Sequence, residues 1–99
     1  MNPKHFGLKT LDLKNKEYEK WVKTKPCLIS GCYGKPQFHH CWHCRSNDYL
    51  GVPLCETHHM PGHPGSYHTL EHEEFEKRHN LNLSWEIINL LVEWNTRNE

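Results

Sequence analysis

Residues 27–63 read CLISGCYGKPQFHHCWHCRSNDYLGVPLCETHHMPGH, and they contain all five cysteines and six of the ten histidines of the 99-residue chain. An odd number of cysteines argues against a disulfide framework, and cysteines mixed with histidines at short spacings are typical of metal sites. A chain of this length forms one domain with a thin core, which a structural metal would stabilise. The segment therefore predicts a metal-stabilised domain with reduced thiols.

Within this segment the residue pattern predicts two strands and the start of a helix. Residues 27–36 read as a loop because of their glycines, and residues 37–42 and 49–54 read as strands joined by a polar turn. A helix is expected to begin near Cys55, and the run His63-Pro64-Gly65-Ser66 is expected to end it.

Helices are predicted on both sides of this core. The first spans residues 13–23 with Asp12 as its cap, and the second spans residues 70–78 after Thr69. The last follows Ser84, and its apolar stripe is expected to face the core; the stripe contains Trp85, Ile88, Leu91 and Val92. The sequence thus predicts a single α+β domain, residues 1–99. Its parts are a basic arm and helix over 1–26, a metal core over 27–66 and C-terminal helices over 67–99.

Two short spacings in the core predict a structural zinc site. Cys27 and Cys32 are separated by four residues, and Cys55 and His58 by two, so each pair fits a tight turn. Together they complete a tetrahedral set of nitrogen and sulfur ligands. Cys41 and Cys44 form a second C-x-x-C pair, which could replace the first pair or build another site.

The remaining histidines predict a second, catalytic metal. Neighbouring strand residues point to opposite faces, so His39 can bind a metal while His40 faces a substrate. His59 and His63 are four residues apart and would reach one point from a helix. Three neutral imidazoles, from His39, His59 and His63, leave open positions on a metal, as catalysis requires. The ion itself is left open among Mg²⁺, Mn²⁺, Ni²⁺ and Zn²⁺.

The order of these motifs resembles the HNH (His-Me finger, ββα-metal) endonucleases. The resemblance rests on the His39-His40 pair, the turn with Asn47 and Asp48, and the run PLCETHH with a later histidine. The C-x-x-H-H-x-x-x-H run and the later FEKRHNLNL are similar to the phage recombination-enhancement (Ref-like) branch. The resemblance implies a small ββα-metal core and a metal-dependent DNA endonuclease. It also implies that His40 is the general base and that Asn47 or Asp48 takes the middle position of the HNH motif, the one named N.

Charge is uneven along a chain whose formal net charge is zero. Residues 1–36 carry eight lysines against three acidic residues, and the rest of the chain is acidic to the same extent. Lys16, Lys20 and Lys23 would form one stripe on a helix and are the expected DNA contacts. Their small number predicts weak binding, assisted by a recombinase or another DNA-bound protein.

The same sequence also allows two functions other than a DNA endonuclease. A non-catalytic zinc-binding module that binds nucleic acid or acts as an adaptor uses the same cysteines and histidines, although it leaves the His39-His40 pair without a role. A ribonuclease would share the phosphodiester chemistry. We expect no membrane contact and a place in the cytoplasm of a phage-infected or bacterial cell, because no apolar run approaches about 20 residues.

Overall fold

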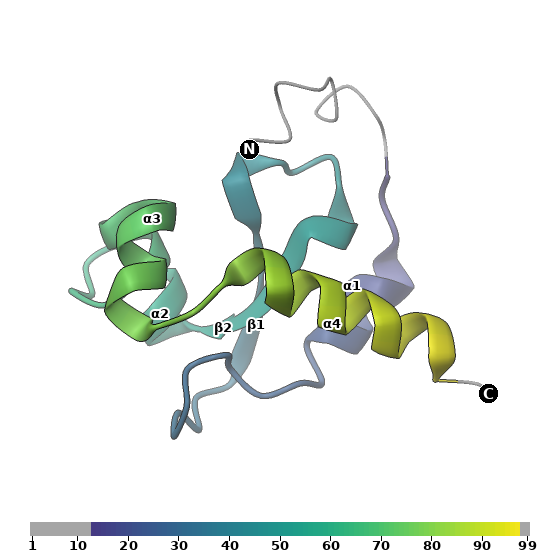
Figure 1. Cartoon of the computed structure of the whole chain (residues 1–99), viewed down its shortest axis with the longest axis horizontal. Coiled ribbons are helices and arrows are strands. Elements are labelled where there is room, and N and C mark those ends of the chain that lie inside the picture. The colour runs from purple at the N-terminus through teal and green to yellow at the C-terminus, as the bar shows by residue number, and fades with distance from the viewer. Residues whose placement is uncertain (1–12, 98–99) are drawn as a thin grey trace.

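A computed structural model describes residues 13–97 of the chain. The expected Asp12 cap and the lysines before residue 13 lie outside this range. The described part is a small α+β structure in which a two-stranded antiparallel sheet lies between helices. Figure 1 shows the hairpin in the middle, with α2 and α3 on one side and α1 and α4 on the other.

The sheet pairs β1 (Pro36–His40) with β2 (Gly51–Cys55), and its register sets His40 opposite Gly51 and Pro36 opposite Cys55. Every residue of β2 is buried, which explains its unbroken small and apolar sequence. A Cβ atom on Gly51 would lie 2.0 Å from the ring of Phe38, so only glycine fits beneath that ring.

The strands are shorter than the sequence suggested. Residues 41–43 form a 3-10 helix, η3, and Asp48–Leu50 form another, η4. Trp42 and His43 both have left-handed backbones, with φ of 54° and 57°. Two such residues in succession turn the chain sharply, so the predicted extension of the first strand to Trp42 was wrong.

Three of the four α-helices found between residues 13 and 97 begin after a capping side chain, although not the one expected, and α2 begins without one. The helices are α1 (Lys16–Val22), α2 (Glu56–His59), α3 (Tyr67–His79) and α4 (Leu83–Thr96). Asn15, Ser66 and Asn82 accept hydrogen bonds from the first turns of α1, α3 and α4. The predicted caps Thr69 and Ser84 lie inside the first turns because an earlier polar residue satisfies the same amide groups.

The buried face of α4 also differs from the prediction. Leu83, Ile87 and Leu90 are buried, whereas Trp85, Ile88 and Val92 are 59%, 50% and 57% exposed. Of the predicted stripe, only Leu91 packs against the core, where it is partly buried. Both sets recur at helical spacing, and the sequence alone did not show which set faces the core. None of the helices found between residues 13 and 97 has the length and apolar character needed to cross a bilayer.

Candidate functional site

Four side chains predicted to bind zinc lie together at one end of the hairpin. The ligand atoms of Cys27, Cys32, Cys55 and His58 all lie within 4.8 Å of one another. Cys55 Sγ is 3.2 Å from His58 Nδ1, Cys32 Sγ is 3.4 Å from Cys55 Sγ, and Cys27 Sγ is 3.7 Å from His58 Nδ1. Tetrahedral zinc with these ligands requires separations of roughly 3.5–3.8 Å. Two of the three separations are up to a few tenths of an ångström shorter than this, and the donor set is that of a structural zinc ion.

The backbone brings these ligands together from three segments. The amide of Leu28 donates to Pro53 O, which ties the Cys27 loop to β2. Cys55 ends β2 and precedes α2, so His58 follows within one helical turn. A Cβ atom on Gly34 would lie 2.7 Å from Cys55 Cβ, so the loop passes close to this ligand.

Burial affects the two thiols of this centre differently. Burial raises the pKa of the Cys27 thiol to about 11. Burial would also raise the pKa of Cys55, but hydrogen bonds from Cys32 and from the His58 amide outweigh it and lower that pKa. Cys41 and Cys44, the alternative pair, are buried in the core, and neither belongs to a ligand group among residues 13–97.

A second group of histidines gathers near the C-terminal residue of α2, His59. The ligand nitrogens of His39, His59 and His68 lie within 4.8 Å of one another. Burial, reinforced by the neighbouring histidines, lowers the pKa of His39 to about 2 and that of His59 to about 4. His39 Nε2 is buried without a hydrogen-bond partner in the described structure. Neutral imidazoles around an unsatisfied buried nitrogen fit a divalent metal ion.

The third histidine of this group differs from the one expected. His59 is the last residue of α2, and Met60 already has an extended backbone. His63 therefore lacks the helical spacing that would bring it to His59, and it is absent from both ligand groups. Pro61 follows directly and is poorly suited to continue the helix. His68 takes its place from the first turn of α3, which is set apart from the rest of that helix by Glu71, with φ of 65°.

Neighbouring side chains hold two of these histidines in place. Gln37 Oε1 lies 2.9 Å from His59 Nδ1, so the amide oxygen accepts the Nδ1 proton and leaves Nε2 for a metal. Gln37 can do this because it lies on the same face of β1 as His39. The buried ring of Tyr67 packs 4.0 Å from the His39 ring, centre to centre.

Replacing Gln37 by alanine is expected to weaken metal binding at the three histidines by about 10- to 100-fold, the usual effect of losing such a partner. Titration of the zinc-loaded protein with a second metal ion, followed by calorimetry, would measure the affinity. Lys35→Ala, two residues earlier, is the control and should keep the wild-type affinity. Unchanged affinity in Gln37→Ala would show that the His59 ring is oriented without this contact.

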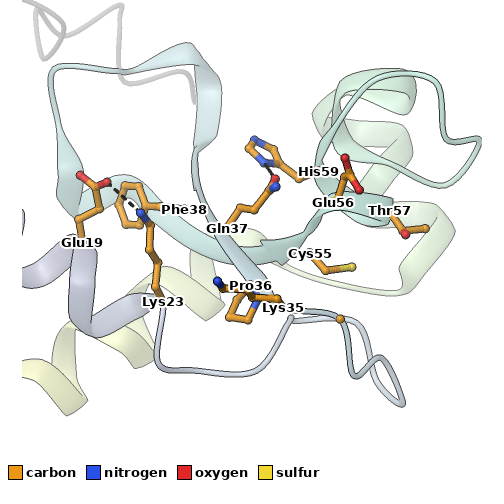
Figure 2. A pocket seen from close by; sticks show the side chains of 11 residues that line it. Glu19, Lys23, Lys35, Pro36, Gln37, Phe38, Cys55, Glu56, Thr57 and His59 are labelled. Atoms are coloured by element: carbon orange, nitrogen blue, oxygen red, sulfur yellow. Dashed lines mark hydrogen bonds and ion pairs between the residues drawn. The ribbon is translucent and has the colours of Figure 1, made fainter.

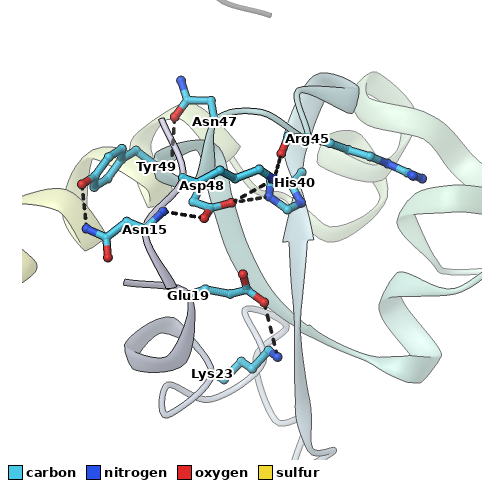
Figure 3. Close-up of polar contacts among 9 residues, drawn as sticks. Asn15, Glu19, Lys23, His40, Arg45, Asn47, Asp48 and Tyr49 are labelled. Atoms are coloured by element: carbon cyan, nitrogen blue, oxygen red, sulfur yellow. Dashed lines mark hydrogen bonds and ion pairs between the residues drawn. The ribbon is translucent and has the colours of Figure 1, made fainter. Parts of the chain in front are cut away.

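His40 points to the other side of β1 and is held by a carboxylate. His40 Nε2 lies 2.8 Å from Asp48 Oδ1, and the amide of Asn15 donates to Asp48 Oδ2 over 2.7 Å (Figure 3). Burial would raise the pKa of Asp48, but these hydrogen bonds and the nearby Lys14 lower it overall. An ionised Asp48 keeps the proton of a neutral His40 on Nε2, which leaves Nδ1 to accept one.

The structure separates the two candidates for the middle motif position. Asn47 accepts a hydrogen bond from the Tyr49 amide and so closes its own turn. Asp48 alone of the two contacts His40. The bend at Trp42 and His43 brings His43 into a cavity of about 290 Å³, which is also lined by His39, His40, Arg45, His59 and His68.

The three lysines expected to bind DNA do not line one common hollow. Lys23 pairs with Glu19 over 3.6 Å and lines a hollow that reaches His59. Lys20 lines a different hollow, together with Trp21 and Trp94. Lys16 is exposed and lines neither of these hollows.

Comparisons of the chain with protein-family models, with curated proteins and with solved structures found no match.

Proposed function

We propose that this protein is a metal-dependent endonuclease that hydrolyses phosphodiester bonds of DNA, with a core of the ββα-metal type formed by β1, β2 and α2. The observation that carries the proposal is the position of His40. It is anchored by Asp48 and lines the same cavity as the three histidines suited to a metal. A purely structural zinc protein has no need of a polarised histidine beside a second metal site.

The side chains divide the reaction between them. His40 Nδ1 removes a proton from the attacking water, and Asp48 stabilises the imidazolium that results. Asp48 also keeps the ring in one orientation, because its second oxygen is fixed by the Asn15 amide. A divalent ion held by His39, His59 and His68 would stabilise negative charge on the phosphate and the leaving oxygen. The expected products carry 5′-phosphate and 3′-hydroxyl ends.

Supercoiled plasmid incubated with the zinc-loaded protein tests the proposal directly. Mg²⁺, Mn²⁺, Ni²⁺ and Zn²⁺ are added separately, and an RNA of similar length is run beside the plasmid. We expect nicked and linear DNA with at least one ion, ligatable ends and no cleavage after chelation. If no ion supports cleavage although both centres hold metal, the protein is a zinc-binding module. Cleavage of RNA alone would make it a ribonuclease.

A further inference from the structure

Two hollows on the surface lie next to each other at the candidate site. The cavity that contains His40 shares Phe38 and His59 with a larger hollow of about 810 Å³. Figure 2 shows Lys23 and Phe38 on one side of this larger hollow and Gln37 and His59 on the other. The two hollows are neighbours along β1, and we call the surface that they line together the β1 groove.

Cationic side chains lie at both ends of the β1 groove. Arg45 lines the end near His40, and Lys35 lines the opposite end. The larger hollow also contains Lys23, which is paired with Glu19, and the carboxylate of Glu56, so Arg45 and Lys35 are the cations left for a ligand. Arg45 and Lys35 are exposed, and neither side chain forms an ion pair within residues 13–97. Two cations available at the ends of a groove suit a polyanion that passes through it.

The middle of the groove offers a rigid apolar surface. The ring of Phe38 packs over Gly51 and meets the His40 ring edge-on, with centres 4.9 Å apart. The five residues of β1 extend over about 13 Å, which is longer than the distance between neighbouring phosphates on one DNA strand. The groove therefore has the length to hold the phosphates on both sides of a cleaved bond.

We propose that one strand of DNA lies along the β1 groove, with Arg45 and Lys35 binding phosphates on opposite sides of the phosphate next to His40. Phe38 supports the sugar between them. This inference rests on the proposed function and names the residues that bind its substrate. It assigns the main phosphate contacts to residues outside the predicted lysine stripe, because Lys16 and Lys20 lie outside the groove and Lys23, which lines it, is paired with Glu19.

Binding to a labelled DNA duplex, measured by fluorescence anisotropy, tests the inference without any cleavage. All proteins carry His40→Ala, so that the DNA stays intact, and are loaded with zinc. Arg45→Ala and Lys35→Ala are each expected to weaken binding about fivefold, the effect of one exposed charge contact. Each should also reduce the salt slope by about 0.9. Lys16→Ala and Lys20→Ala are the matched controls and should change affinity less than twofold.

Equal losses in the controls and in the groove variants would overturn the inference, as would wild-type affinity in Arg45→Ala and Lys35→Ala. Arg45→Lys should recover part of the affinity, and equal melting temperatures would show that the variants are folded. Failure of the inference and failure of the proposed function are distinguishable. Loss of binding in the groove variants alone supports the groove even if no metal supports cleavage. Cleavage of DNA by the wild type, together with normal DNA binding by Arg45→Ala and Lys35→Ala, would support the proposed function and contradict the inference.

Discussion

Replacing Cys55 by serine is expected to unfold the domain at room temperature. Cys55 is a ligand of the candidate zinc centre, and it also joins β2 to α2. Structural zinc contributes roughly 10–16 kcal/mol of binding free energy in small domains. The total stability of a domain is only about 5–15 kcal/mol. Loss of the zinc therefore removes most or all of the free energy that keeps this chain folded.

Circular dichroism on heating, together with the zinc content of the purified protein, would measure this effect. Chelation of zinc from the wild type should give the same unfolded spectrum. Cys44→Ser is the matched control, because Cys44 is equally buried but lies outside the ligand group. It should lower stability by about 1–3 kcal/mol, the cost of a buried polar group, and keep its zinc. Full zinc content and an unchanged melting temperature in Cys55→Ser would disprove the structural role of this centre.

Replacing His40 by alanine is expected to lower the rate of DNA cleavage by about 10²- to 10⁴-fold, the usual contribution of a general base. Binding of both metals should persist, because His40 belongs to neither ligand group. Asp48→Asn should also slow cleavage, since an amide does not stabilise the imidazolium as a carboxylate does. Single-turnover cleavage at saturating protein and metal would separate these effects from changes in binding.

His63→Ala provides the matched histidine control for this experiment. His63 lies outside both ligand groups, so its removal should leave metal content and cleavage near those of the wild type. His68→Ala should lose the second metal instead. Near-normal cleavage by His40→Ala would exclude His40 as the base, and loss of the second metal in His63→Ala would restore His63 as its ligand.

Short-range spacing allowed much of the site to be predicted. The two cysteine and histidine pairs of the zinc centre each lie within one turn, so their spacing already indicates a shared ion. Strand alternation likewise separated His39 from His40. His68 was missed because its approach to His39 depends on how the first turn of α3 packs against the hairpin. The break at residues 63–66, which ends in the capping Ser66, was a local signal that a new helix begins there.

Other features depend on contacts between distant residues. Asn47 and Asp48 look alike in a polar turn, and the choice between them depends on His40 and Asn15, which are far away in the sequence. The two apolar stripes of α4 are similar in composition, and tertiary packing alone selected the one that is buried.

The helix α2 is only four residues long, and it carries ligands of both candidate centres on adjacent residues, His58 and His59. A helix of this length does not persist alone in water, so its geometry depends on what its side chains bind. An ion at the cysteine centre would fix His58 and thereby order His59 in advance. Filling of the two centres is then thermodynamically linked, and each ion raises the affinity for the other by the same factor. Folding around an ion at the cysteine centre would therefore prepare the three histidines for the second ion.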